Sequence, residues 1–556
     1  MRISRLPAAL TLVAICAACT QPTGERETAP AAGAGVVASA HPEATAAGIR
    51  ILDAGGNAFD AAVAVAAALN VVEPGMSGLG GYGTIMTYHA TSGRARFLNT
   101  SGRIPAGVDS DAFRAPTPGY EQNRRGAKAV STPVNLRGWE ALWKEYGSRE
   151  WAELFTPAIA LARDGFVLGE YDAGEIGDAF EAFPPYARAI FGRGDAPLKQ
   201  GDRLVQSDLA RTFTTIAQSG AAAFYQGDIA ARMDAVMRER GGFLSLADLR
   251  AAEAEWYDPI RIRYRDVDVV TAPPPANTFD FLVRLGIMST KDVRALGHNS
   301  TDHLHTFAEA TKHGFWVRLA HAGDPDVASP PLDRLLSQNY WRERAARIDP
   351  AKARPFEPPQ IESAGDHTTH FVVADAAGNV VSATQTLGNA FGARIMVEGT
   401  GVWLNNSLAY STFEPKGNPM DAHAGRHKLS GDCPTILFRD GRPWVALGTP
   451  GGHTIGQTVP QIIMNLVDFG MDLEQALAAP RIAFAQPDAI LVERSFPADA
   501  RAALTARGHR LREVYAIGNA TALAIEYGAD GTPQRFVGAA DPRGDGDARV
   551  AGGRRP

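Results

Sequence analysis

Two strand-like runs joined by a single turn constrain the fold of this chain more than any other feature of its sequence. Residues 369–374 and 380–386 are rich in β-branched and apolar side chains, and Asp375-Ala-Ala-Gly-Asn379 between them has the composition of a turn. With the turn centred on residue 377, Thr368 lies opposite Thr386 in an antiparallel pair, where Cβ atoms are about 4.5–5.5 Å apart. The pattern predicts two hydroxyl groups in contact at the open end of a hairpin. Such a pair can also serve only to stabilise a sheet, so the hairpin alone leaves its role open.

The remainder of the chain predicts antiparallel sheet covered by helices. The middle, about residues 138–350, alternates amphipathic helices with short connections. A proline-rich connector at residues 351–365 then leads into the strand-rich part. The expected helices include residues 43–52, 58–72, 208–219, 228–240, 301–320 and 459–469, the last with Pro460 near its start. The expected strands include residues 84–88, 402–405, 435–439 and 444–448.

The composition is that of a large folded protein without an excess of basic residues. The 556 residues are 45% apolar, and 55 Lys and Arg against 61 Asp and Glu give a net charge of −6. A chain with this balance lacks the positive charge that neutralises a phosphate backbone, so we expect no nucleic-acid partner. Cys433 is the one cysteine outside the first twenty residues, and a lone cysteine is typically a buried apolar residue.

Two further motifs suggest ligands, and structural roles are the favoured interpretation of both. The glycine-rich segment at residues 75–83 contains a dinucleotide spacing, but a helix precedes it and a strand follows, the reverse of the order that a phosphate site needs. His305, Glu309 and His313 follow at four-residue spacing and share one helix face, which makes them the best metal candidate. They lack the His-Glu-x-x-His pattern and a further ligand. We expect no metal and no organic cofactor.

The first residues resemble an export signal. Two arginines precede an apolar run at residues 6–18, which is too short to span a bilayer as a helix and suits a signal peptide at residues 1–19. The run ends in Ala17-Ala-Cys19, similar to a lipoprotein signal, although Cys16 stands where that signal usually has Leu. Residues 20–35 have the composition of a flexible tether. We therefore expect a periplasmic protein with a lipid anchor at Cys19, or without the anchor if the signal is an ordinary cleaved one.

Several ordered motifs carry a resemblance to a known family. Together they span about residues 35–545, nearly the whole of the expected exported chain. The sequence is similar in these motifs to the gamma-glutamyltransferase family. They are Gly55-Gly-Asn57, Asp366-His-Thr-Thr-His370, Leu404-Asn-Asn406, Leu429-Ser430, Pro434-Thr435, Gly448-Thr-Pro-Gly-Gly452 and Asp541-Pro-Arg543.

The resemblance implies a fold and a maturation step. The implied fold is of the α/β (α+β) class, a four-layer αββα sandwich with antiparallel sheets, of the N-terminal nucleophile hydrolase type. It also implies a precursor that cuts itself between His367 and Thr368. The expected products are a large-subunit segment, residues 36–367, and a small-subunit segment, residues 368–556, that carries the nucleophile.

The resemblance also implies catalytic roles. The Thr368 hydroxyl would be the nucleophile, and its new α-amino group would be the base, since the reference pKa of that group is about 7.7–8.0. Thr386 would hold the hydroxyl by a hydrogen bond. The backbone N–H groups of Gly451 and Gly452 would stabilise the oxyanion of the tetrahedral intermediate.

The substrate-binding positions depart from the family pattern. The Arg that holds the substrate α-carboxylate is replaced by Ser101, and Arg103 would share the same face if these residues formed a strand. The Asp that holds the α-amino group is replaced by Tyr410. An expected Asn is Gly388, and the second Ser of a Ser-Ser pair is Gly431. The other expected substrate-binding residues are Ser407 and Ser430.

Three functions remain open at this point. The first is hydrolysis or transfer of a γ-glutamyl amide of the glutathione type. The second is an acylase or amidase that acts on a non-glutamyl amide, because a pocket without counter-charges leaves an amino-acid head group poorly paired. The third is an exported binding protein without catalysis. The expected partners are a small-molecule amide, with water or an amine as acyl acceptor, and the two chains of one precursor.

Overall fold

A computed structural model describes residues 35–357, 367–486 and 488–552 of the chain. All of these described residues belong to one compact unit. The predicted signal peptide and nearly all of the predicted tether lie outside the described residues. Among the described residues, no helix combines the length and the apolar character that crossing a membrane requires.

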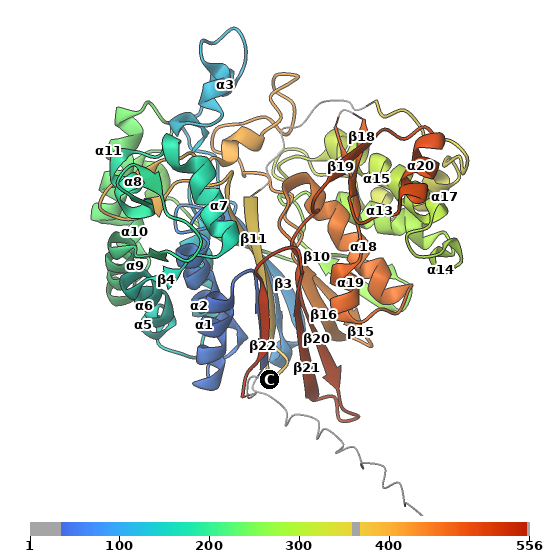
Figure 1. The fold of residues 1–556 in the computed structure, drawn as a ribbon, viewed down its shortest axis with the longest axis horizontal. Helices are drawn as coiled ribbons and strands as arrows, with labels where there is room; N and C mark the ends of the chain where they lie inside the picture. The colour runs from blue at the N-terminus through green and yellow to red at the C-terminus, as the bar shows by residue number, and fades with distance from the viewer. Residues whose placement is uncertain (1–34, 358–366, 487, 553–556) are drawn as a thin grey trace, which may run out of the picture. The chain divides into compact units, whose positions relative to one another are not determined.

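Two large antiparallel sheets form the centre of the described molecule (Figure 1). The first has seven strands in the order β22 (Asp547–Val550), β1 (Gly35–Ser39), β11 (His367–Asp375), β12 (Val380–Gly388), β2 (Tyr82–His89), β3 (Arg94–Asn99), β8 (Glu255–Tyr257). The second has six, in the order β21 (Pro533–Ala540), β20 (Thr521–Tyr527), β16 (Arg442–Gly448), β15 (Thr435–Arg439), β10 (Val267–Thr271), β9 (Ile260–Tyr264). The strands expected at residues 84–88, 435–439 and 444–448 therefore exist.

Strands β11 and β12 form the predicted hairpin in the predicted register. Thr369 pairs with Gln385 and Ala374 with Val380, which centres the turn on residue 377. A bulge follows between His367 and Thr369, so that His367 pairs with Gly388 rather than with Leu387. A bulge at a strand end re-aims the side chain that it contains, and here that side chain belongs to Thr368.

Three apolar layers hold the sheets and helices together. Alternate side chains of β11 point to opposite faces, as the two-residue period of a strand requires. Phe371 and Val373 pack in the layer between the first sheet and its helices, whereas Val372 and Ala374 pack between the two sheets. A third layer lies between the second sheet and its own helices. The result is the expected order of helix, sheet, sheet and helix.

The helices divide between the outer faces of the two sheets (Figure 1). α1 and α2 pack on the first sheet, and α13, α18 and α19 on the second. The helices on the side of the first sheet are α1 (Pro42–Asp53), α2 (Ala58–Val72), α4 (Asn135–Tyr146), α5 (Trp151–Leu154), α6 (Thr156–Asp164), α7 (Glu170–Ala179), α8 (Pro185–Phe191), α9 (Ser207–Ser219), α10 (Ala222–Gln226) and α11 (Asp228–Glu239). Those on the other side are α13 (Phe279–Ser289), α14 (Val293–Leu296), α15 (Thr301–His321), α17 (Gln338–Ala345), α18 (Ile455–Val467), α19 (Leu473–Ala478) and α20 (Ala498–Ala506).

Several expected element boundaries differ from the structure by one or two residues, and that of α18 differs by more. Helix α18 begins at Ile455, four residues before the expected start, and Pro460 lies inside it rather than near its first residue. The preceding Gly452–Thr454 turn is a short 3₁₀ helix that continues into α18, a feature without periodicity in the sequence. Strand β14 (Val402–Trp403) ends two residues before the expected boundary, and a short 3₁₀ helix follows at Ser407–Tyr410.

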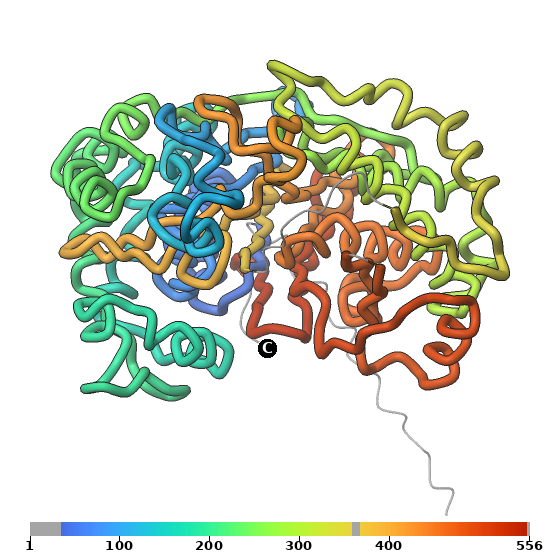
Figure 2. Tube along the Cα trace, turned by 90° about the horizontal axis from the view of Figure 1, so that it is seen from above, coloured from blue at the N-terminus to red at the C-terminus, as the bar shows by residue number. Residues whose placement is uncertain are grey.

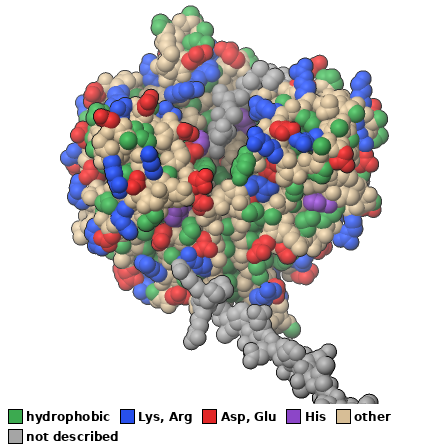
Figure 3. Space-filling model, viewed as in Figure 1, with side chains coloured by type: hydrophobic (Ala, Val, Ile, Leu, Met, Phe, Trp, Pro, Cys, Tyr) green, Lys and Arg blue, Asp and Glu red, His purple; other side chains and the backbone are tan. Residues whose placement is uncertain are grey.

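The distribution of charged side chains on the surface agrees with the nearly balanced charge of the sequence. On the face drawn in Figure 3, the basic and acidic side chains of the described residues are interspersed, and they form no continuous basic stripe there.

The helical side built from the first 250 residues also contains a segment from later in the chain. Figure 2 shows the chain around residues 390–430 running among the helices of that side.

Candidate active site

The two threonines of the hairpin meet at the end of β11 and β12. The Thr386 hydroxyl donates a hydrogen bond of 2.6 Å to the carbonyl oxygen of His367. Thr386 Oγ1 in turn accepts from the Thr368 hydroxyl at 3.3 Å and from the N–H of Gly388 at 2.8 Å. Thr368 and Thr386 are both buried. The Thr368 hydroxyl is therefore held beside the carbonyl group of the peptide bond that precedes it.

The Gly451-Gly452 turn faces the same cavity. Both residues have positive φ, 129° and 54°, and a Cβ on Gly451 would lie 2.4 Å from Thr454 Oγ1, so this turn requires glycine. In the described part of the chain, neither N–H donates a hydrogen bond to another residue. The turn also leads directly into the N-terminus of α18, where the helix dipole favours negative charge. The turn can stabilise an anion.

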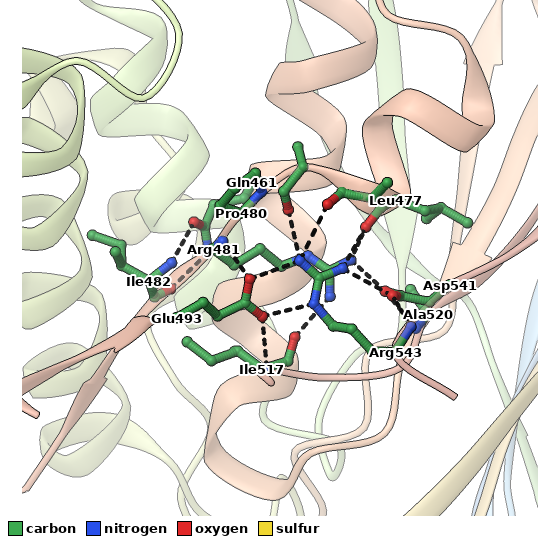
Figure 4. Close-up of polar contacts among 12 residues, drawn as sticks. Gln461, Leu477, Pro480, Arg481, Ile482, Glu493, Ile517, Ala520, Asp541 and Arg543 are labelled. Atoms are coloured by element: carbon green, nitrogen blue, oxygen red, sulfur yellow. Dashed lines mark hydrogen bonds and ion pairs between the residues drawn. The ribbon is translucent and has the colours of Figure 1, made fainter. Parts of the chain in front are cut away.

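A buried ion network joins Arg481, Glu493, Asp541 and Arg543 (Figure 4). Arg481 pairs with Asp541, and Arg543 pairs with Glu493 at 2.7 Å and with Asp541 at 2.9 Å. The Glu493 carboxylate also accepts from the N–H of Ile517 at 2.8 Å. Buried charges are stable only when they are paired and hydrogen-bonded, and these four are. The Asp541-Pro-Arg543 motif thus has a structural role here.

The network supports the turn through one intermediate segment. This segment is residues 517–520, which begins at Ile517 in the network. The N–H of Asn519 in it donates to Thr449 Oγ1 at 3.1 Å. The Cα of Gly518 lies 3.7 Å from the position that a Cβ would take on Gly451. Displacement of residues 517–520 would therefore move the glycine turn.

A pocket brings together five of the expected site residues. Thr368, Thr386, Gly452, Tyr410 and Ser430 all line it. The remaining lining residues include Tyr82, Ile104, Asn277, Arg318, Gly388, Ser411, Met420, Asp421, Lys428, Gly431, Asp432 and His453. The nucleophile candidate, its threonine partner and the anion-binding turn therefore share one cavity.

Three expected substrate-binding residues do not line this pocket. Ser101 is buried, and its hydroxyl donates to the carbonyl of Gly83 at 3.2 Å. Ser407 is fully buried. Arg103 follows the end of β3 rather than continuing it, and its guanidinium pairs with Glu255 at 3.0 Å. The expectation that Arg103 takes the place of the missing Arg by sharing a strand face is wrong, because the strand ends at residue 99.

Tyr410 and Gly388 depart from the family pattern as a matched pair. Gly388 has a φ of 100°, and a Cβ there would lie 2.3 Å from Asn406 Oδ1 and 2.9 Å from the Tyr410 ring. The Tyr410 hydroxyl donates to Asn389 Oδ1. The loss of the Asn side chain at residue 388 therefore makes room for a neutral aromatic ring beside Thr386.

The pocket contains two cations that the sequence motifs do not indicate. Arg318 comes from α15, and Lys428 from the loop before β15. Gly431 leaves space for the guanidinium, since a Cβ there would lie 3.0 Å from Arg318 Nη1. Burial raises the pKa of Asp432 to about 6, while a hydrogen bond from Ser430 and the charges of Lys428 and Arg318 lower it. Arg318, Lys428 and the Asp432 carboxylate therefore lie together in the pocket, which Asp421 also lines.

The residue before Lys428 is fixed by ion pairs. His427 Nδ1 lies 2.9 Å from Asp324, and its Nε2 lies 3.0 Å from Glu255. Burial lowers the pKa of His427, but the hydrogen bonds with Glu255 and Asp324 outweigh it, so that the pKa is raised overall. Asp324, Asp326 and His427 also lie close enough together to hold a metal ion. Because both ring nitrogens already contact carboxylates, we assign the group as an ion-paired imidazolium that positions Lys428.

The earlier metal candidate on α15 does not form a common site. His305 contacts His509 at 2.8 Å, whereas Glu309 pairs with Lys312 and His313 contacts the Tyr340 hydroxyl at 3.0 Å. Each side chain has a different partner, which agrees with structural roles. Cys433 is buried, and burial raises its thiol pKa well above the usual value. A thiol in that environment is a poor nucleophile.

Comparison with known proteins gives a consistent set of relatives. The sequence model of the family described as Gamma-glutamyltranspeptidase matches residues 44–551. The Acylase ACY 1 proenzyme of Pseudomonas sp. (strain V22) is 36% identical over 95% of this chain and 96% of its own. The glutathione hydrolase proenzyme of Bacillus subtilis (strain 168) is 35% identical over 92% and 91%. The crystal structure of cephalosporin acylase from Bacillus halodurans has a TM-score of 0.86 and 29% identity over 96% and 99%. The structural likeness confirms the expected αββα sandwich of the N-terminal nucleophile hydrolase type.

Proposed function

The chain belongs to the gamma-glutamyltranspeptidase family, and from that premise we propose that it is a self-processing amide hydrolase whose nucleophile is Thr368. The preferred substrate is an amide of a dicarboxylic acid, with a free carboxylate at the far end of the acyl group and no α-amino group. The observation that carries this proposal is the composition of the pocket beside Thr368, with Arg318, Lys428 and the neutral Tyr410 ring.

The first reaction is cleavage of the chain itself. The Thr368 hydroxyl adds to the carbonyl carbon of His367, whose oxygen is polarised by the Thr386 hydroxyl at 2.6 Å. The C–N bond breaks as the nitrogen takes up a proton, and the His367 acyl group moves to the Thr368 oxygen as an ester. Water then hydrolyses the ester. The products are a carboxylate on His367 and a free α-amino group on Thr368.

The second reaction uses the new α-amino group as base. It accepts the proton of the Thr368 hydroxyl as that oxygen attacks the substrate amide, and the N–H groups of Gly451 and Gly452 receive the oxyanion. The leaving amine takes the proton and departs, which leaves an acyl-enzyme ester. Water, or an amine acceptor, attacks this ester and releases the acid or a new amide. Thr386 holds the nucleophile throughout.

The charges of the pocket favour an acyl group with one carboxylate. The carboxylate of Asp421 is already paired with Arg114, so it does not count as a partner for substrate. Arg318 and Lys428 line the same pocket as Thr368. A terminal carboxylate can accept charge-assisted hydrogen bonds from these two cations, whereas the added ammonium of a glutamyl group cannot.

A γ-glutamyl amide is the second candidate, and Asp432 is the observation that favours it. This carboxylate lies in the same pocket and could receive an α-ammonium group. Relatives named glutathione hydrolase match the chain as well as the acylases do. The two candidates differ in a single group of the substrate.

Glutaryl-p-nitroanilide and L-γ-glutamyl-p-nitroanilide separate the two candidates, because they differ only by the α-amino group. We expect kcat/KM for the glutaryl amide to be higher by about tenfold or more, as one charge-assisted contact implies. Lys428→Met should lower kcat/KM mainly for the glutaryl amide, and Asp432→Asn should not. A preference for the glutamyl amide that Asp432→Asn abolishes would replace the dicarboxylic proposal by the glutamyl one. Turnover of neither, in a protein that has cut itself at Thr368, would refute both.

We also propose that the protein is exported and anchored by a lipid on Cys19. The sequence of residues 1–19 supports this, and the residues concerned lie outside the described structure. Cell fractionation tests it with Cys19→Ser as the matched variant. We expect the unchanged protein in the membrane fraction and the variant in the soluble periplasmic fraction. Both proteins in the soluble periplasmic fraction would mean an ordinary cleaved signal.

A further inference from the structure

A second cavity lies apart from the candidate active site, where α15, α17 and the connector after α17 meet. Its volume is about 290 Å³. Small-molecule pockets usually measure about 300–1,000 Å³, so this cavity suits a ligand of one or two rings. The side chains that matter for its chemistry are Lys312, Trp316, Arg344, Arg347, Arg354 and Phe356.

One wall of the cavity is positively charged. Lys312 pairs with Glu309 at 3.2 Å, and Glu343 is shared between Arg344 at 3.2 Å and Arg347 at 3.0 Å. Arg354 has no carboxylate within 4.0 Å among the residues that the structure describes. The Nε of Arg344 is buried and finds no hydrogen-bond partner within that same part of the chain. Two guanidinium groups thus have donor capacity left for a ligand.

The pKa of a neighbouring histidine is lowered by this positive charge. His313 also lines the cavity, and its pKa is lowered to about 3 by burial and by the charges of Arg344, Arg354 and Arg347. These three guanidinium groups therefore act on the same small volume. An anion placed there would be stabilised by all of them.

The other wall is aromatic. Trp316 is 39% exposed, which is unusual for so large an apolar side chain in this protein. Phe356 is held by the ring of Phe484, with centroids 4.5 Å apart, and by that of Phe315 at 6.1 Å. Phe315 in turn contacts His453, which lines the candidate active site. The cavity therefore lies one aromatic layer away from the catalytic pocket without being part of it.

We infer that this second cavity binds a small aromatic carboxylate, with the ring against Trp316 and Phe356 and the carboxylate on Arg354 and Arg344. Neither the nucleophile nor the glycine turn takes part, so the inference is independent of the proposed function. A flat guanidinium matches a carboxylate in a bidentate manner, and an aromatic ring gains by stacking on an exposed indole. The geometry requires both properties in one ligand.

Calorimetric titration of the purified protein with 3-phenylpropanoate tests the inference, and 3-phenylpropanol is the neutral counterpart. Arg354→Gln and Trp316→Ala alter the two walls at exposed positions, so the variants should fold normally, which a thermal melt checks. Lys352→Gln is the matched control. It also removes one positive charge, two residues from Arg354, but the Lys352 side chain does not line the cavity. Lys428→Met reports any binding in the catalytic pocket.

We expect saturable binding with a Kd raised about tenfold or more in Arg354→Gln and in Trp316→Ala, and within about twofold of the original in both Lys variants. The alcohol should bind about tenfold more weakly or not at all. Absence of saturable binding would overturn the inference. So would loss of binding in Lys428→Met alone, or equal affinity for the acid and the alcohol.

Discussion

At the scale of single residues, the glycine at position 388 decides the shape of the pocket beside Thr368. Gly388→Ala combines a positive φ of 100° with a Cβ 2.3 Å from Asn406 Oδ1. We expect this variant to lose several kcal/mol of unfolding free energy, because left-handed strain alone costs about 1–2 kcal/mol and the clash adds to it. Self-cleavage should slow as well, since the N–H of residue 388 holds Thr386.

The control for this substitution is Gly470→Ala, at a φ of 66° with no atom within 4 Å of its would-be Cβ. Gly470→Ala should lose only the unfolding free energy that the left-handed backbone strain costs, without the contribution of a steric clash. Denaturant unfolding of both variants, made in a Thr368→Ala background so that each remains a single chain, provides the comparison. Equal losses in the two variants would mean that Gly388 is not needed for the contact with Asn406 and Tyr410.

Glu73 gives a second prediction for a single residue, and it concerns pH. Its buried carboxylate accepts from Thr369 Oγ1 at 2.7 Å, next to the nucleophile. Burial raises its pKa to about 7, against a hydrogen bond from Thr369 that lowers it. Between pH about 4.5 and about 7 the unfolded chain releases this proton while the folded chain keeps it, so the residue lowers stability as pH rises. The loss is complete above pH about 7 and is at most about 3 kcal/mol.

Glu73→Gln removes the titration and can still accept from Thr369. We therefore expect the variant to gain stability relative to the original protein at pH 8 but not at pH 4.5. Urea unfolding at both pH values, again in the Thr368→Ala background, measures the difference. Glu253→Gln, at an exposed position, is the control. A gain that is equal at the two pH values would contradict the assignment.

At the scale of elements, one buried ion pair fixes a wall of the catalytic pocket. Arg114 precedes α3 (Tyr120–Asn123), and it pairs with Asp421 and donates to the carbonyl of Phe413 at 2.6 Å. The rings of Phe113 and Phe413 stack with centroids 4.9 Å apart. Asp421 itself lines the pocket. A segment from each side of the cleavage point is thus joined at the pocket wall.

Arg114→Met should lower the unfolding free energy by about 3–5 kcal/mol, because it leaves the Asp421 carboxylate buried without its partner. It should also raise KM for the glutaryl amide more than it lowers kcat, since the wall positions substrate rather than the reacting atoms. Thermal melts and steady-state kinetics measure the two effects. The double variant Arg114→Met/Asp421→Asn removes both charges and should recover part of the stability. A single variant as stable as the original would show that the pair contributes nothing.

At the scale of the whole molecule, the large and small segments that the proposed cleavage would produce are interleaved. In the first sheet, β1 of the large segment lies between β22 and β11 of the small one, and β12 of the small segment pairs with β2 of the large one. In the second sheet, β15 of the small segment pairs with β10 of the large one. Cutting the bond before Thr368 leaves these ladders intact.

We therefore expect the mature protein to elute from a size-exclusion column as one species that contains both chains. The chains should separate only on a denaturing gel, where Thr368→Ala shows a single full-length band. Elution of the two chains at different volumes in native buffer would contradict the interleaved assembly. N-terminal sequencing of the smaller chain should begin at Thr368.

Local sequence patterns predicted the features that depend on neighbouring residues alone, such as the register of a hairpin and the ends of a helix. The hairpin register follows from a two-residue period on each side of one turn, and α2 has the predicted boundaries because Asn57 caps it and its apolar run is continuous. The pairing of Thr368 with Thr386 needed no more than this. Helix α18 began earlier than predicted because it continues directly from the Gly452–Thr454 3₁₀ helix, whose sequence carries no periodicity.

The sequence by itself therefore determined the family, the layered fold and the two threonines, since each rests on short-range pattern or on ordered motifs. Only the tertiary structure decided which charged side chains line the pocket beside Thr368. Arg318 enters it from a helix that starts 67 residues before Thr368, and Arg103 leaves it because β3 ends at Asn99. Where a long charged side chain points depends on the packing of distant elements around it, and no local period records that packing.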